Sequence, residues 1–180
     1  MSWVVWFTGL PGCGKTTIAQ KTKEILQEMG VEASILQLDE IRRAITPHPR
    51  YTEEERDIVY ASLAYMAKLL WEHGINVIVD ATANRQRYRD LARCMITDFA
   101  EIYVQAPLEV CRSRELERRA RFSPSGIYKK AENGAPVPGV GAPYEAPLAA
   151  EIVLDTIELN PSEAGRTAAQ QIVELFPNHA

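Results

Sequence analysis

Gly9-Leu10-Pro11-Gly12-Cys13-Gly14-Lys15-Thr16 is the stretch of sequence that decides the fold. It fits the phosphate-loop (Walker A) pattern, in which two glycines bracket four residues and Gly-Lys-Ser/Thr follows. Residues 3–8, just before it, are apolar and rich in β-formers, which predicts a buried strand. Residues 16–29, just after it, predict a helix that Gly30 ends. Strand, loop and helix in this order favour a nucleoside triphosphate site over a chance glycine-rich turn.

The glycines of this loop are needed for a physical reason. Phosphate oxygens must come close to backbone N–H groups, and side chains would block that approach. The helix after the loop directs its N-terminal N–H groups at the phosphates. We expect Lys15 to reach the β- and γ-phosphates and the Thr16 hydroxyl to ligate Mg²⁺, so ATP and Mg²⁺ are the expected cofactors. The predicted ATP-binding residues are Gly9, Leu10, Pro11, Gly12, Cys13, Gly14, Lys15, Thr16 and Thr17.

Composition narrows the class of protein. A chain of 180 residues suggests one domain, here residues 1–180. The net charge of −4 gives no general attraction to nucleic acid or membranes, so neither is an expected partner. The opening apolar run is too short for a secretory signal. The three cysteines lack metal-ligand spacing, and we expect reduced thiols in a cytoplasmic protein.

The rest of the chain alternates β-rich runs with amphipathic segments. We predict strands over residues 33–38, 76–80, 100–105 and 152–154, and helices over 39–45, 52–73, 85–96, 161–175 and from Pro107 onward. Thr52 and Ser162 are the predicted caps of two helices. Ile58, Leu63, Met66 and Leu70 form the predicted apolar face of the helix over 52–73. The alternation predicts an α/β fold of the P-loop NTPase type, a three-layer sandwich around a central parallel sheet.

Two acidic residues follow predicted strands. Because ligands gather at the carboxyl ends of parallel strands, we expect Asp39, Asp80 and the phosphate loop to converge there. Asp39 is the candidate base or Mg²⁺ partner, and it is also placed to cap a helix. Asp80 is either a metal ligand or a helix cap. A base in loose phosphoryl transfer needs no raised pKa, because the hydroxyl loses its proton late.

A basic stretch over residues 112–130 leads into a Gly-, Pro- and Ala-rich stretch over residues 132–147. We interpret residues 112–147 as a lid that closes over the site, since transfer to a substrate rather than to water requires closure. Arg114 is the candidate catalytic lid arginine over the transferring phosphates. The alternative is a solvated basic helix followed by a disordered tail.

Several further runs of the sequence resemble a known kinase family. They are Phe7-Thr8-Gly9-Leu10, Ala106-Pro107-Leu108-Glu109-Val110-Cys111, Gly126-Ile127-Tyr128-Lys129-Lys130-Ala131, Pro143-Tyr144-Glu145-Ala146-Pro147 and Val153-Leu154-Asp155-Thr156. Their order and approximate spacing, from about residue 3 to residue 156, resemble the adenylyl-sulfate kinases. The resemblance implies an ATP-dependent kinase of sulfate assimilation. It transfers the γ-phosphate to the 3′-hydroxyl of adenosine 5′-phosphosulfate (APS).

The resemblance also implies roles for single residues. Asp39 assists the acceptor hydroxyl or Mg²⁺, and Arg42 and Arg56 hold the sulfonucleotide, although either arginine also suits a surface salt bridge. Tyr51 stands where the family usually has a Phe that packs on the adenine. The implied acceptor-binding set is Asp39, Arg42, Tyr51, Arg56, Ala83, Lys129 and Val137, and the implied metal set is Thr16, Asp39 and Asp80.

The chain departs from the family pattern on the acceptor side. The family's Asn, second Phe, lid Lys and Ser-Pro are replaced by Val59, Val137, Ser125 and Ala83-Asn84, and extra residues surround Glu117 to Phe122. Asp80-Ala81-Thr82-Ala83-Asn84 looks more like broader P-loop small-molecule and polynucleotide 5′-kinases. Two alternatives stay open: a related kinase with another small phosphorylated or nucleotide-like acceptor, and a non-catalytic ATP-binding module. A homodimer is one expectation for the assembly.

Overall fold

The computed structural model describes residues 2–117 and 126–177. The strands are β1 Val4–Thr8, β2 Ala33–Gln37, β3 Asn76–Asp80, β4 Phe99–Gln105 and β5 Ile152–Asp155. The helices are α1 Lys15–Glu28, α2 Leu38–Ile45, α3 Glu53–Glu72, α4 Gln86–Met95, α5 Leu108–Glu117, α6 Ile127–Glu132 and α7 Pro161–Leu175. The strands form one sheet in the order β2-β3-β1-β4-β5, and every pairing is parallel.

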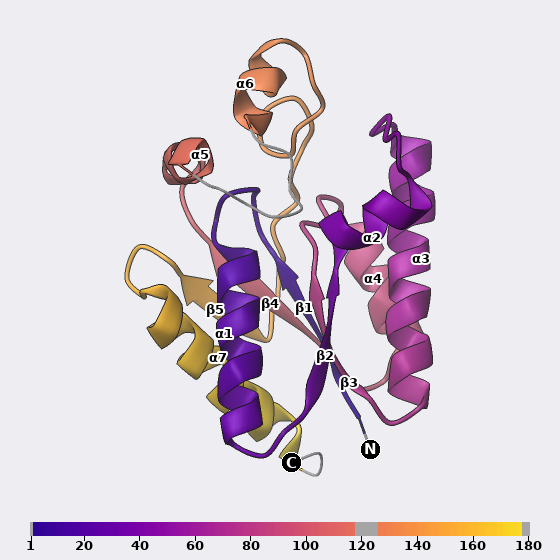
Figure 1. Cartoon of the computed structure of the whole chain (residues 1–180), viewed down its shortest axis with the longest axis vertical. Coiled ribbons are helices and arrows are strands. Elements are labelled where there is room, and N and C mark those ends of the chain that lie inside the picture. The colour runs from indigo at the N-terminus through magenta and orange to yellow at the C-terminus, as the bar shows by residue number, and fades with distance from the viewer. Residues whose placement is uncertain (1, 118–125, 178–180) are drawn as a thin grey trace.

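Helices cover both faces of this sheet (Figure 1). Along β1, Val5 and Phe7 belong to a core that includes residues of α1 and α7, whereas Val4 and Trp6 belong to a second core with residues of α3 and α4. Successive strand residues point to opposite faces, so a strand buried on both sides has no polar face. The two cores confirm the predicted α/β three-layer sandwich with a parallel sheet.

Helix α3 buries a different face from the predicted one. Thr52 caps it as expected, since its hydroxyl accepts the Glu55 N–H at 3.2 Å. Ile58 is 61% exposed, however, and Met66 lies outside the core. The buried face runs through Val59, Tyr60, Leu63, Ala64 and Ala67. A helix buries positions three and four apart. Of the predicted face, Leu63 is buried and Leu70 packs partly buried against the same core.

Other boundaries moved by a residue or two. Helix α2 starts at Leu38, and α7 keeps its predicted bounds but has a different cap. Asn160 caps α7, because its side-chain oxygen accepts the N–H groups of Ser162 and Glu163, and Glu163 bonds back to the Asn160 N–H. Ser162 was therefore the wrong residue: Pro161 fills the first helical position, and the capping side chain comes just before it.

The predicted lid rises from the carboxyl edge of the sheet, where Figure 1 shows α5 and α6. Residues 133–151 contain no helix or strand beyond an isolated bridge between Pro138 and Ala142, which agrees with the prediction for residues 132–147 except at Glu132, the last residue of α6. Residues 118–125 lie outside the described part of the chain. They include Ser125 and most of the extra residues expected around Glu117 to Phe122. Within the described residues, no helix is both long and apolar enough to cross a membrane.

Candidate active site

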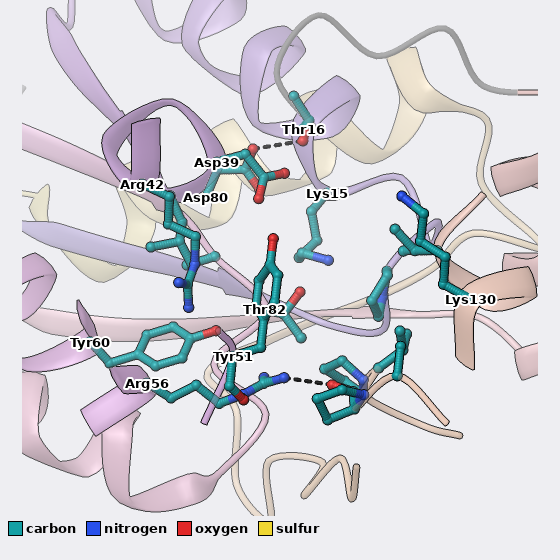
Figure 2. A pocket seen from close by; sticks show the side chains of 18 residues that line it. Lys15, Thr16, Asp39, Arg42, Tyr51, Arg56, Tyr60, Asp80, Thr82 and Lys130 are labelled. Atoms are coloured by element: carbon teal, nitrogen blue, oxygen red, sulfur yellow. Dashed lines mark hydrogen bonds between the residues drawn. The ribbon is translucent and has the colours of Figure 1, made fainter. Parts of the chain in front are cut away.

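A cavity of about 240 Å³ opens at the carboxyl edge of the sheet. Its walls come from the phosphate loop, α2, α3, the end of β3, α6 and the segment over 135–138. The lining residues are Pro11, Lys15, Thr16, Leu38, Asp39, Arg42, Tyr51, Arg56, Tyr60, Asp80, Ala81, Thr82, Ile127, Lys130, Ala135, Pro136, Val137 and Pro138. Figure 2 shows their side chains converging from segments that are far apart in the sequence.

The phosphate loop packs directly on neighbouring backbone. A Cβ on Gly9 would lie 2.4 Å from the Val104 carbonyl oxygen, and one on Gly12 would lie 2.4 Å from that of Cys111. Gly12 also has a φ of +83°, which side chains rarely adopt. At Gly9 and Gly12 the loop therefore has no room for a side chain, and a close-packed backbone of this kind fits a bound phosphate chain.

The two polar residues after the glycines are held in place. The buried Lys15 donates from Nζ to the carbonyl oxygens of Gly9 at 2.9 Å and Leu10 at 3.0 Å. Both carbonyl partners are neutral, so neither offsets the positive charge that an incoming phosphate would meet. The Thr16 hydroxyl donates to the Asp80 carboxylate at 2.7 Å. These contacts place a cation and a hydroxyl–carboxylate pair at one end of the cavity (Figure 2).

This pair fits Mg²⁺. The ion takes oxygen ligands in an octahedron and is usually held by one or two protein groups together with substrate phosphates and waters. Among residues 2–117 and 126–177, no group of three or more His, Cys, Asp or Glu side chains could hold a metal by itself. Thr16, Asp39 and Asp80 all line the cavity and carry oxygen atoms, the ligand type that Mg²⁺ prefers.

The helix-cap alternatives for the two acids do not hold. The N-cap of α4 is Arg85, and the Asp80 carboxylate instead contacts the phosphate loop. The N-cap of α2 is Gln37, and Asp39 is the second residue of the helix, with its side chain lining the cavity. Both carboxylates therefore belong to the site.

Arg42 faces the cavity from α2 and pairs with α3. Its Nη1 lies 3.0 Å from Glu55 Oε1, and both side chains are largely buried. Burial raises the pKa of Glu55, but the N–H groups of Arg50 and Tyr51 and the Arg42 guanidinium outweigh it and hold that pKa below its ordinary value. The salt-bridge alternative thus describes Arg42 in part, although the residue also lines the cavity.

Arg56 links three separate segments to α3. Its guanidinium donates to the Tyr51 carbonyl at 3.1 Å, to Asn84 Oδ1 at 3.3 Å and to the Pro136 carbonyl at 2.5 Å. None of these acceptors is charged. A guanidinium has five N–H donors, so some of them stay available to an anionic ligand while the others hold the wall of the cavity.

Two predicted acceptor residues do not line the cavity. Ala83 is fully buried, donating its N–H to the Tyr60 hydroxyl at 3.0 Å and accepting from Arg89 at its carbonyl. Lys129 is exposed, and its neighbour Lys130 lines the cavity instead. On one short helix, adjacent residues point in directions about 100° apart, so a motif alone does not say which faces inward. Val137 lines the cavity as expected.

Arg114 also differs from the prediction. Its guanidinium donates to the hydroxyl of Thr156 at 2.7 Å, to the carbonyl of Thr156 at 2.8 Å and to the carbonyl of Cys13 at 3.4 Å. It therefore joins α5, the segment after β5 and the phosphate loop, and is not among the cavity-lining residues. Arg114 thus contacts the phosphate-loop backbone, and its position over the transferring phosphates stays a prediction.

Sequence reasoning gave no role to the residues that fasten the end of the predicted lid. The Asn84 amide donates to the Pro143 carbonyl at 3.0 Å. The Tyr144 hydroxyl lies 3.1 Å from that of Thr8, and burial raises the pKa of Tyr144. Glu145 pairs with Arg85 at 3.0 Å. In the sequence the Pro-Tyr-Glu-Ala-Pro run is only a family motif, and its anchoring contacts appear only in three dimensions.

The chain is similar to known proteins in sequence and in fold. Residues 1–155 match the family model described as adenylylsulphate kinase. A probable adenylyl-sulfate kinase of Pyrococcus abyssi is 36% identical over 173 residues, 95% of this chain and 95% of that protein. An adenylyl-sulfate kinase of Synechococcus sp. is 34% identical over 161 residues, 88% of this chain and 87% of that protein. The structure of the Mycobacterium tuberculosis APS kinase CysC in complex with AMPPNP and APS has a TM-score of 0.83 at 28% identity, over 98% of both chains.

Proposed function

The chain belongs to the adenylylsulphate kinase family, and from that membership we propose how its site carries out the reaction. Its activity is that of an adenylyl-sulfate kinase of sulfate assimilation, a phosphotransferase with an alcohol acceptor. The γ-phosphate of ATP passes to the 3′-hydroxyl of APS. One observation supports the assignment of residues: a single cavity joins Lys15 and Thr16 of the phosphate loop to Asp39, Arg42 and Arg56.

On the donor side, the phosphate-loop backbone holds the ATP phosphates, and Lys15 leaves its carbonyl partners for the β- and γ-phosphates. Thr16, Asp80 and Asp39 are the proposed Mg²⁺-binding residues. When bound there, Mg²⁺ would neutralise the charge that develops during transfer. Asp80 keeps the Thr16 hydroxyl pointed at that position, which is what their 2.7 Å hydrogen bond supports.

On the acceptor side, Asp39 accepts the proton of the reacting hydroxyl. Arg42 and Arg56 line the cavity on the acceptor side and suit the phosphosulfate group, since a guanidinium matches phosphate and sulfate oxygens. Tyr51 and Val137 line the same cavity and are proposed to contact the nucleoside. The homodimer and the cytoplasmic location stay predictions from the sequence.

The test is ADP release by the purified chain with ATP and Mg²⁺, with and without APS. We expect release that depends on APS and a 3′-phosphorylated product. Release that appears only with another phosphorylated or nucleotide-like acceptor would point to the related-kinase alternative. ATP binding without turnover on any acceptor would point to a non-catalytic module. A parallel titration of Mg²⁺ tests the metal requirement.

A further inference from the structure

Tyr51 has an unusual backbone. Its φ is +57°, and among the described residues only Tyr51 and Ala83 combine a side chain with a positive φ. This left-handed conformation is unfavourable for a bulky residue and persists where the surrounding structure enforces it, often at functional sites. Here the Tyr51 carbonyl accepts the Arg56 Nε–H at 3.1 Å, which fixes the backbone between α2 and α3.

The Tyr51 ring is held as well. The guanidinium carbon of Arg42 lies 5.1 Å from the ring centroid, and that of Arg56 lies 5.9 Å from it. Both distances allow cation–π attraction, which uses the faces of the ring. The edge that carries the hydroxyl is left to project into the cavity. Figure 2 shows this hydroxyl pointing toward the part of the cavity where Lys15 and Asp39 lie.

The hydroxyl is a proton donor at neutral pH. Burial raises the pKa of Tyr51, and the Asp39 carboxylate raises it further, against a lowering by the Arg42 and Arg56 guanidinium groups. A neutral phenol in this position can donate one hydrogen bond and accept others.

These observations indicate a role for the Tyr51 hydroxyl beyond stacking of its ring. In the reaction proposed above, the acceptor hydroxyl must lie between Asp39 and the phosphate held by Lys15. We infer that Tyr51 is a further catalytic residue, whose hydroxyl donates a hydrogen bond to the reacting 3′-oxygen of the acceptor and fixes its direction of attack. The inference rests on the proposed function, and it assigns a task to the oxygen atom that distinguishes Tyr51 from the family's usual Phe.

Bonds and protons balance in the phosphoryl-transfer step without any chemical change in Tyr51. The 3′-oxygen forms a bond to the γ-phosphorus while the bond between that phosphorus and the β,γ-bridging oxygen breaks. ADP leaves with the electron pair, and the proton of the 3′-hydroxyl goes to the Asp39 carboxylate. Tyr51 keeps its own proton throughout and acts by positioning the attacking oxygen, a term that can be large in phosphoryl transfer.

Two substitutions separate the hydroxyl from the ring. Tyr51→Phe removes only the oxygen and has the same backbone requirement, so the fold and the ring contacts remain. Tyr51→Leu removes the aromatic ring as well. Tyr65→Phe is the matched control, because Tyr65 lies on the exposed face of α3 and is 52% exposed. The wild-type chain is assayed first with ATP and APS. Absence of wild-type turnover would count against the proposed function, independently of Tyr51.

If the wild-type chain turns over APS, we expect Tyr51→Phe to lower kcat about tenfold or more, because the variant loses a hydrogen bond at the reacting centre. The KM for ATP and the midpoint of thermal unfolding should stay at their wild-type values, and Tyr65→Phe should behave as wild type. Tyr51→Leu should in addition raise the KM for APS. If Tyr51→Phe keeps the wild-type kcat while Tyr51→Leu loses activity, the ring alone acts and the inference is wrong. A Phe variant that changes only thermal stability would overturn it too.

Discussion

At the scale of single residues, the phosphate loop combines a fixed backbone with a lysine side chain that can turn toward a bound phosphate. Lys15 is buried and donates to the carbonyls of Gly9 and Leu10 and to the Cys13 sulfur at 3.8 Å, and Thr16 is fixed by Asp80. Exchange of two carbonyl contacts for phosphate oxygens requires a rotation of one side chain and no change of the backbone. Charge can therefore be brought to the transferring group at little cost in reorganisation, which is the main source of electrostatic catalysis.

Lys15→Ala should abolish measurable transfer and leave the fold intact. The variant loses a cation that stabilises the transition state, and removal of such a donor costs on the order of 3–4 kcal/mol in activation free energy. The measurements are APS-dependent ADP release and the midpoint of thermal unfolding. Near-normal turnover in the variant would contradict the assignment of the phosphate loop.

Asp39→Asn should lower kcat far more than it raises the KM for ATP. The carboxylate is proposed to act at the acceptor hydroxyl and the metal, away from the adenine and ribose of ATP. Steady-state kinetics with each substrate varied in turn separates the two parameters. A variant with unchanged kcat and lower thermal stability would show that Asp39 supports α2, and Asp80 would become the candidate base.

At the scale of secondary-structure elements, polar contacts between α2 and α3 shape the acceptor side. Arg42 on α2 pairs with Glu55 on α3, and Glu55 also accepts the N–H of Arg50 from the connecting segment at 2.6 Å. This one carboxylate thus connects both helices and the loop that carries Tyr51. Arg56, one residue later, extends the connection to Pro136. The position of Tyr51 depends on a network and not on its own packing.

Glu55→Gln should destabilise the chain at neutral pH and have a smaller effect in acid. The pKa of Glu55 in the folded chain is below its ordinary value of 4.5, so its stabilisation is fully present above that value. The contribution fades as the pH falls through the lowered pKa, because the protonated carboxyl loses its attraction for Arg42. Urea unfolding of both proteins across this pH range should show a difference that shrinks toward low pH.

A matched control for this experiment is Glu72→Gln, whose carboxylate pairs with Lys68 on the exposed side of α3 at 2.5 Å. Exposed pairs contribute little, so we expect no clear pH-dependent difference from wild type there. A constant difference for Glu55→Gln at every pH would argue that packing, and not charge, explains its effect.

At the scale of the whole molecule, one buried arginine connects the sheet to the end of the predicted lid. Arg89 on α4 is fully buried and pairs with Glu101 on β4 at 3.2 Å. The same guanidinium donates to the Glu145 carbonyl at 2.7 Å and to the carbonyl of Ala83. The stability of the core and the placement of the segment after the acceptor cavity are therefore coupled through one side chain.

Arg89→Ala should destabilise the chain by about 3–5 kcal/mol, because the Glu101 carboxylate stays buried without its main partner. The double variant Arg89→Met with Glu101→Leu should recover part of that loss, since apolar replacement of a buried pair is often nearly neutral. Urea unfolding measures both. If the single variant differs from wild type by less than about 1 kcal/mol, the pair contributes little and the coupling is wrong.

The sequence by itself determined the sheet, the phosphate loop and the family. These follow from local patterns: apolar runs mark strands, helical spacing marks helices, and the loop motif needs only eight consecutive residues, Gly9 to Thr16. The family followed from short runs whose order is preserved along the chain. Asp39 and Asp80 were found because strand ends can be located in sequence and parallel strands bring them together.

Only the tertiary structure decided which side chains share the cavity. Arg56 meets a carbonyl 80 residues away, and Arg114 meets one 42 residues away. No local pattern encodes such contacts, because they arise when separate segments pack against the same core. For this reason Val59 belongs to the core, Ala83 is buried, and Lys130 rather than Lys129 reaches the site. The direction of the Tyr51 hydroxyl is set by a strained backbone and by Arg42 and Arg56, which lie near Tyr51 in the sequence but meet its ring only in the folded chain.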